Sequence, residues 1–399
     1  MRLPSPYDRL LIPIYLPSAL TAIGTQALLL LLPLYALEIS GSPAFAALVV
    51  GLRGLGTLLA DMPAGLLAGR YGDRRLMTGG LAAILLTTLG LALAPTGWSV
   101  ALLAVPYGGG LAAWLLGRQS YITDTTAAYE RGRAVVVMAG IQRAGSFVGP
   151  LAGGFVAAFL GYQAAFAAGA LLAGVAAGFV LASARTVSPW RTGAPPAFGR
   201  VIASNRRVLA TAGSAALALQ LMRTTRQLLI PLFGSLVGLD AAAIGLVYSL
   251  GAALDMSLFY PVGLVMDRWG RKWSGVPSML AFAVGLSMLP LARGFASLLA
   301  VTLLLGLANG LGSGIVMIIG MDLAPEDSRG QFLGVWRLIG DVGGVGGPLL
   351  VGVLVNLSSL AAASLASAGV GALGAIVLAL WVPETLGYRR RSPRYHDVG

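Results

Sequence analysis

The feature that most constrains this chain is its series of long apolar stretches. Each reaches the length at which a run of about 20 apolar residues can cross a ~30 Å hydrocarbon core as a helix. Apolar residues make up 57% of the 399 residues and charged residues only 11%, whereas soluble domains are near a quarter charged. We therefore expect an all-α polytopic membrane protein with twelve transmembrane helices. Their expected ranges are 10–35, 43–68, 77–97, 99–122, 134–159, 163–183, 208–237, 241–265, 275–292, 296–321, 331–356 and 359–382.

Basic residues predict the orientation of these helices. Arginine and lysine gather at both ends of the chain and in alternate loops, and on the opposite side only Arg293 departs from this pattern. Loops rich in lysine and arginine face the cytoplasm, so we expect both termini there. Topology then explains the net charge of +12, and we do not expect a nucleic-acid partner. The basic positions are Arg2, Arg9, Arg70, Arg74, Arg75, Arg131, Arg133, Arg268, Arg271, Lys272, Arg329 and Arg389 to Arg391.

The longest polar break, rich in proline and arginine, separates six predicted helices from six. It predicts an N-terminal bundle over 1–183, a cytoplasmic linker with a short surface helix over 184–207, a C-terminal bundle over 208–385 and a basic tail over 386–399.

The two predicted bundles repeat one sequence at an offset of 198 residues. "PAGLLAGRYGDRR" at 63–75 matches "PVGLVMDRWGRK" at 261–272 without a gap. Six is an even number of helices, so both copies start in the cytoplasm and have the same orientation. Parallel repeats of this kind bind substrate near the midplane and transport it by rocking one half against the other. Further matched pairs are Pro33 with Pro231, Asp124 with Asp322, Gly149 with Gly347, and Pro150 with Pro348.

On these motifs the whole chain resembles the major facilitator superfamily, whose members carry a G-x-x-x-D-R-x-G-R-R motif in both loops. The second copy matches it from Gly263 to Lys272, but the first has Gly69 at the aspartate position and Asp73 four residues later. The resemblance implies a cytoplasmic gate at these loops; as an alternative, the arginines serve only as anchors on the cytoplasmic side. The candidate gate residues are Gly65, Arg70, Gly72, Asp73, Arg118, Asp124, Asp267, Arg268, Asp322 and Arg337.

The fifth predicted helix contains "GSFVGPLAGG", which resembles the antiporter motif of the same family. Small residues let helices approach closely, and proline bends a helix because its ring removes a backbone donor. Helix packing alone is the alternative explanation. The motif residues are Gly145, Gly149, Pro150, Gly153 and Gly154.

Charged residues inside the predicted helices are the main candidates for function. Each costs at least ~2.5–3.5 kcal/mol at the bilayer centre, so it should face water, a partner or a ligand. Six arginines stand against three aspartates, and this excess favours an anionic or zwitterionic substrate. The arginines are Arg53, Arg118, Arg143, Arg223, Arg226 and Arg337, and the aspartates are Asp61, Asp255 and Asp341.

A buried carboxylate can carry a proton whereas arginine cannot. We therefore take the three aspartates as proton-coupling candidates; alternatively, they only neutralise arginines. The substrate-binding candidates are Gln26, Arg53, Gln142, Arg143, Arg223, Arg226 and Asn309, although polar side chains also link helices.

These features together predict a secondary transporter, a proton-coupled antiporter that exports a small organic compound. Uptake of an organic anion by proton symport is the alternative within transport, and a membrane sensor that binds without transporting is the alternative outside it. The chain has no cysteine and its one histidine, His396, lies in the tail. We therefore expect no enzymatic activity, no metal and no cofactor. We expect a monomer in a bilayer, the bacterial inner membrane, with protons and a small molecule as its partners.

Overall fold

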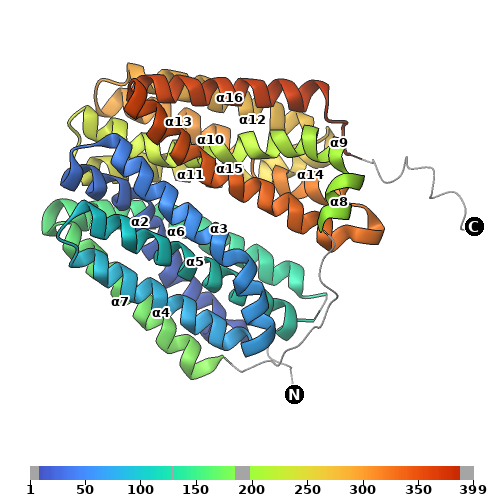
Figure 1. The fold of residues 1–399 in the computed structure, drawn as a ribbon, viewed down its shortest axis with the longest axis horizontal. Helices are drawn as coiled ribbons and strands as arrows, with labels where there is room; N and C mark the ends of the chain where they lie inside the picture. Colours follow the sequence, from blue (N-terminus) through green and yellow to red (C-terminus); the bar gives the residue numbers. More distant parts are fainter. Residues whose placement is uncertain (1–8, 128, 185–197, 387–399) are drawn as a thin grey trace, which may run out of the picture. The chain divides into compact units, whose positions relative to one another are not determined.

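A computed structural model describes residues 9–127, 129–184 and 198–386, without the side chains of residues 62, 65–69 and 198. The described chain folds into helices joined by turns, with no strand in these ranges (Figure 1). This confirms the predicted all-α class.

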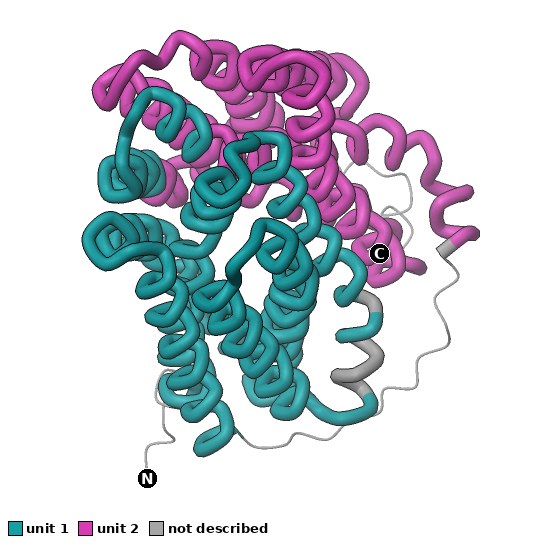
Figure 2. The backbone as a smooth tube through the Cα atoms, turned by 60° about the vertical axis from the view of Figure 1, so that its left-hand side comes forward, with its two compact units in different colours: residues 1–192, 230–252 teal, residues 193–229, 253–399 magenta. Residues whose placement is uncertain are grey.

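The chain forms two compact units, which are coloured separately in Figure 2. Unit 1 contains residues 1–192 and 230–252. Its helices α3 and α4 pack on α5, and α6 and α7 pack on α2. The elements of its first segment are η1 (Leu11–Tyr15), α2 (Leu16–Ser40), α3 (Pro43–Tyr71), α4 (Asp73–Ala92), α5 (Gly97–Thr125), α6 (Arg131–Leu160) and α7 (Tyr162–Ser183).

Unit 2 contains residues 193–229 and 253–399, so helices α10 and α11 each continue from one unit into the other. Within unit 2, helix α12 packs against α13 and α16. Its short helix α8 lies within the predicted linker. The elements are α8 (Phe198–Ser204), α9 (Arg206–Val208), η2 (Leu209–Gly213), α10 (Ser214–Leu236), α11 (Ala241–Arg268), α12 (Lys272–Met288), η3 (Leu289–Leu291), α13 (Phe295–Leu311), α14 (Ile315–Leu323), η4 (Glu326–Ser328), α15 (Arg329–Leu357) and α16 (Leu360–Leu380).

Eleven helical segments of the described chain are long and apolar enough to cross a membrane. The predicted helix over 208–237 corresponds to α10, which is 23 residues long but is not among the eleven. Its polar residues, which include Arg223 and Arg226, lower its mean hydropathy. A helix of this length with two arginines is stable in a bilayer only where those charges face protein or water.

Two predicted helices differ from the structure at their ends or centre. The range 296–321 is not one helix, because α13 ends at Leu311 and α14 starts at Ile315. Gly314 between them has φ +75°, a conformation that favours glycine. The range 77–97 was predicted to begin after the charged residues of the loop, but α4 begins at Asp73 and so includes three charged residues in its first turn.

Candidate functional site

A cavity of about 120 Å³ lies inside unit 1, between α2, α3, α5 and α6. Four of the residues predicted from sequence line it, namely Gln26, Arg53, Arg118 and Gln142, although they come from four different helices. The other lining residues are Thr21, Ala22, Thr25, Leu29, Leu111, Trp114 and Leu115.

The amide side of this cavity is held by one hydrogen bond between α2 and α6 and one within α6. Gln26 Nε2 donates to Ser146 Oγ over 2.7 Å, and Ser146 Oγ donates to the backbone carbonyl oxygen of Gln142 over 3.0 Å. The Gln26 side chain is therefore positioned by a partner one helix away, which leaves its carbonyl oxygen as an acceptor.

The two arginines supply the charge of the cavity. Arg53 interacts electrostatically with the phenol groups of Tyr107 and Tyr248, and the Arg118 guanidinium lies 5.8 Å from the ring centroid of Trp114. Among the described residues, neither guanidinium forms a hydrogen bond or an ion pair, and the described lining contains no carboxylate. The cavity is therefore cationic, with aromatic side chains as neighbours of both charges.

Asp255 of α11 pairs with Asn309 of α13 in unit 2. The Asn309 Nδ2 group donates to Asp255 Oδ2 over 2.8 Å, and both side chains are half-buried. The backbone is also close here, because a Cβ on Gly310 would lie 3.3 Å from the Cα of Asp255. A coupling candidate and a substrate-binding candidate are thus joined in one contact.

Arg223 of α10 holds the break between α13 and α14. Its Nη2 donates to the carbonyl oxygen of Gly312 over 2.6 Å, and its Nη1 donates to Gln220 Oε1 over 2.8 Å. The same Gly312 oxygen accepts the backbone N–H of Ile315 over 3.3 Å, so Arg223 adds a second donor at a point where the helix is interrupted and backbone groups at membrane depth need partners. Sequence reasoning missed this break, although "GLGSG" at 310–314 contains three glycines in five residues.

Asp341 lies one turn from Arg337 on α15, and Oδ2 of the first is 3.7 Å from Nε of the second. This ion pair lies within one helix. The remaining candidates, Asp61, Arg143 and Arg226, are placed on α3, α6 and α10 and are not part of the described cavity lining; Arg226 is buried and the other two are half-buried.

The loop between α11 and α12 of unit 2 carries a network of charges around Arg271. Arg271 Nη1 is 3.3 Å from Asp267 Oδ1, and its Nε is 3.2 Å from Asp322 Oδ2. Thr385 Oγ1 also donates to Asp322 Oδ2 over 2.9 Å. Two of the predicted gate residues are therefore bound to the same arginine, and a third helix end is attached through Thr385.

Glu384 belongs to this network and was missed by the sequence analysis. Its carboxylate accepts the backbone N–H groups of Arg271 and Lys272 over 2.8 and 3.1 Å. Burial alone would raise the pKa of Glu384, but the backbone N–H groups of Leu386, Arg271, Lys272 and Thr385 together lower it. The sequence feature that could have identified it is the acidic residue in "PET" at 383–385, directly after the last predicted helix.

The corresponding loop of unit 1 lacks this network. Asp73 is 3% exposed and its Oδ2 has no hydrogen-bond partner among the described residues. It faces Ser120 and Asp124 of α5, and Asp124 is a like charge. Arg70 lies over the ring of Tyr71 at 5.4 Å. Only the backbone of Gly65, within α3, is described, and Arg268 at the matching end of α11 is exposed.

The glycine motif of α6 is a close contact between helices. A Cβ on Gly149 would lie 2.6 Å from the Ile23 carbonyl oxygen, and one on Gly153 would lie 2.6 Å from the Ala27 Cβ, both on α2. Gly154 on the other side of α6 meets the backbone of Ala241 in α11. The motif residues Gly145, Gly149, Pro150, Gly153 and Gly154 are all buried.

A family model of the Major Facilitator Superfamily matches residues 14–344 and 214–397 of the chain. Multidrug resistance protein MdtH of Aeromonas hydrophila is 27% identical over 349 residues, which are 82% of this chain and 84% of that protein. A probable quinate permease of Neosartorya fischeri is 37% identical over 123 residues, which are 30% of this chain but only 21% of that protein.

Solved structures agree on the fold. A D-xylose-proton symporter superposes with a TM-score of 0.71 at 15% identity, over 94% of this chain and 98% of that one. The nucleoside transporter NupG superposes with a TM-score of 0.75 at 14% identity, over 93% of this chain and 100% of that one. With the helices and the family match described above, this chain belongs to the Major Facilitator Superfamily and is a multi-pass membrane transporter of the secondary class.

Proposed function

We propose that this transporter carries a small organic anion and couples its movement to protons. The observation that carries the proposal is the unit 1 cavity, in which Arg53 and Arg118 stand beside two amides without a carboxylate in the described lining. Arginine is charged at every physiological pH, so the cavity offers two permanent cations. A carboxylate or phosphate group supplies the acceptors that such guanidinium groups need.

The size of the cavity supports binding of a head group. About 120 Å³ is the volume of roughly four water molecules in the liquid, enough for a carboxylate and a few further atoms. The indole of Trp114 and the amides of Gln26 and Gln142 would contact the uncharged part of the ligand.

The coupling step is assigned to the aspartates, with Asp255 first. Its bond to Asn309 links α11 to α13, so gain or loss of a proton at Asp255 changes a contact between two helices. Asp341 and Asp61 are the further candidates. Uptake of an anion with protons is the direction that this charge arrangement favours, because protons offset the negative charge of the cargo.

Transport into liposomes with a pH dye inside tests the proposal. Small carboxylates and matched organic cations are added in turn to wild type and to the Arg53→Gln, Arg118→Gln and Asp255→Asn variants. We expect proton movement with the anions only. Loss of one charged hydrogen bond of ~1.5–3 kcal/mol should raise the KM of the arginine variants about ten- to hundred-fold, and Asp255→Asn should uncouple protons from anion flux.

Arg133→Gln is the matched control, because Arg133 is exposed at the start of α6 and does not line the cavity. Preference for cations, or unchanged KM in both arginine variants, would refute the anion assignment. Anion binding without flux would indicate a sensor.

Export by proton antiport is the second candidate, favoured by the glycine motif of α6 and by the likeness to a multidrug resistance protein over 84% of its length. The same liposomes separate the two. Symport acidifies the compartment that the compound enters, whereas antiport acidifies the compartment that it leaves.

A further inference from the structure

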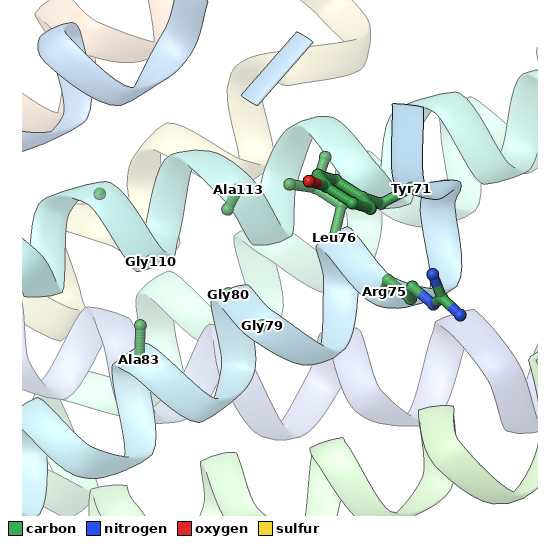
Figure 3. A pocket seen from close by; sticks show the side chains of 9 residues that line it. Tyr71, Arg75, Leu76, Gly79, Gly80, Ala83, Gly110 and Ala113 are labelled. Carbon is green, nitrogen blue, oxygen red and sulfur yellow. The ribbon is translucent and has the colours of Figure 1, made fainter. Parts of the chain in front are cut away.

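A second cavity of unit 1, of about 330 Å³, lies outside the site proposed above. It is formed by α4 and α5 together with the end of α3, and Figure 3 shows Tyr71 and Arg75 at one end and Ala83 and Gly110 at the other. Its volume falls at the lower end of the range of small-molecule sites. The described lining is Tyr71, Arg75, Leu76, Gly79, Gly80, Ala83, Gly109, Gly110 and Ala113.

This second cavity is a groove, and the bottom of the groove is a close crossing of α4 and α5. A Cβ on Gly80 would lie 2.6 Å from the backbone nitrogen of Trp114 and 2.7 Å from the Gly110 carbonyl oxygen, so α4 and α5 are in backbone contact there. By contrast, a Cβ on Gly79 would meet no described atom within 4 Å. The groove is therefore the open space beside a closed helix crossing.

The open side of the groove belongs to a lipid-facing surface of α4. Positions seven residues apart share one face of a helix, so Leu86 is in line with Gly79, and Leu93 follows directly after the end of α4. These leucines are 66% and 76% exposed. Exposed leucines on a membrane-spanning helix indicate contact with lipid chains, so the groove opens toward the bilayer.

One end of the groove is charged. Arg75 is exposed and, among the described residues, its guanidinium has no hydrogen bond or ion pair, whereas the neighbouring Arg74 donates to the Leu181 carbonyl oxygen over 2.6 Å. From Arg75 to Ala83 is eight residues, or about 12 Å along the helix at 1.5 Å per residue. That length stays within one leaflet of a ~30 Å hydrocarbon core.

We propose that this groove binds an anionic phospholipid, with its phosphate on Arg75 and one acyl chain beside the Tyr71 ring and along Gly79, Gly80, Ala83 and Ala113. A small soluble anion would not contact the apolar residues along the groove, and a neutral apolar solute would not pair with the charge of Arg75. Negative lipids and basic residues attract one another at the cytoplasmic leaflet, which is where we expect this end of α4. The site is independent of the transport proposal above.

Lipid retention by the full-length protein tests this. Protein is extracted from vesicles of equal phosphatidylglycerol and phosphatidylcholine, and bound lipids are counted by native mass spectrometry. We expect wild type to retain one phosphatidylglycerol molecule per chain. Since a basic residue at the surface contributes ~1 kcal/mol, Arg75→Gln should lower the ratio of phosphatidylglycerol to phosphatidylcholine about five-fold. Gly79→Leu should fill the groove and remove both lipids.

Two matched controls keep the result specific. Arg133→Gln removes another exposed arginine, and Gly140→Leu adds a side chain at another glycine with open space around it; both should retain lipid like wild type. Equal retention of the two lipids by wild type, or wild-type retention by both groove variants, would overturn the proposal. A dimer that loses its contact in Gly79→Leu would also overturn it, because a second copy of the chain would then fill the groove.

Discussion

The turn between α3 and α4 in unit 1 and the turn between α11 and α12 in unit 2 come from one repeated sequence. Both are closed by a glycine with positive φ, Gly72 at +83° and Gly270 at +116°. The next residue differs in charge, since Asp73 occupies in unit 1 the position that Arg271 occupies in unit 2.

The partner across the turn is an aspartate in both units, so this one difference inverts the interaction. Arg271 attracts Asp322, with their atoms 3.2 Å apart, whereas Asp73 faces the like charge of Asp124. A duplicated turn thus keeps its backbone requirement while its electrostatics change. Unit 2 has an ion-pair network at this end, and unit 1 has a buried carboxylate without a counterion among the described residues.

Making the turn of unit 2 resemble that of unit 1 should have the largest effect on the free energy of unfolding. Arg271→Asp removes two ion pairs and places a third carboxylate beside Asp267 and Asp322. Breaking a buried pair costs ~3–5 kcal/mol, and we expect a loss near 3 kcal/mol here because the network is partly exposed. Chemical unfolding in detergent micelles measures it. Arg268→Asp, an exposed position on the same turn, should change stability far less; equal losses would contradict the role of the network.

Double-mutant cycles sharpen the comparison through the sign of the coupling. Arg271→Gln with Asp322→Asn should give a favourable coupling of about 1–2 kcal/mol, and Asp73→Asn with Asp124→Asn an unfavourable one of about 0.5 kcal/mol, since Asp124 is exposed. The same unfolding assay provides the free energies of wild type and the six variants. Couplings of the same sign in the two units would show that the charges at these turns do not differ in effect.

Glu384 should give a smaller effect that depends on pH. Its folded pKa lies below the ordinary value of 4.5, so its stabilisation is present above that pH and is lost as the pH falls through the folded value. Glu384→Gln should therefore cost about 0.5 kcal/mol at neutral pH, after allowance for solvent screening, and progressively less as the pH falls below 4.5. Melting temperatures of both proteins across this range test it, and a constant difference would exclude the carboxylate as the cause.

The smallest effect is expected at Asp267. Its side chain is 73% exposed, and exposed pairs one helical turn apart contribute ~0.3–0.5 kcal/mol. Asp267→Asn should lower stability by no more than this at low salt, and by nothing measurable at 1 M salt, because screening removes such pairs. A loss approaching that of Arg271→Asp would mean that Asp267, not Asp322, is the main partner of Arg271.

The helices were predictable because apolar length is a local property of the chain. The cavity residues Arg53 and Arg118 were also predictable as buried charges, but their common location was not, since it depends on how α3 and α5 pack. Gln26 was predicted as a cavity residue without its partner Ser146, which lies 120 residues away.

What sequence reasoning missed depends on tertiary contacts. Glu384 follows the last helix in a polar stretch that resembles a solvated tail, and only the fold places it at the first turn of α12. The interruption of the 296–321 range was missed because glycines are common throughout this chain. The three at 310–314 belong to a total of 56 and therefore gave no distinct signal.

The break between α13 and α14 has a mechanical consequence. Residues Phe295–Leu323 would form a single rod of 29 residues if the helix were continuous. Instead they form two shorter helices with a turn at Gly312–Gly314, and the guanidinium of Arg223 in α10 donates a hydrogen bond to this turn. The turn between them is closed by short-range hydrogen bonds such as that from Ile315 N–H to the Gly312 carbonyl oxygen, so the angle between the two segments is set by a three-residue turn and by the one side chain of α10 that contacts it.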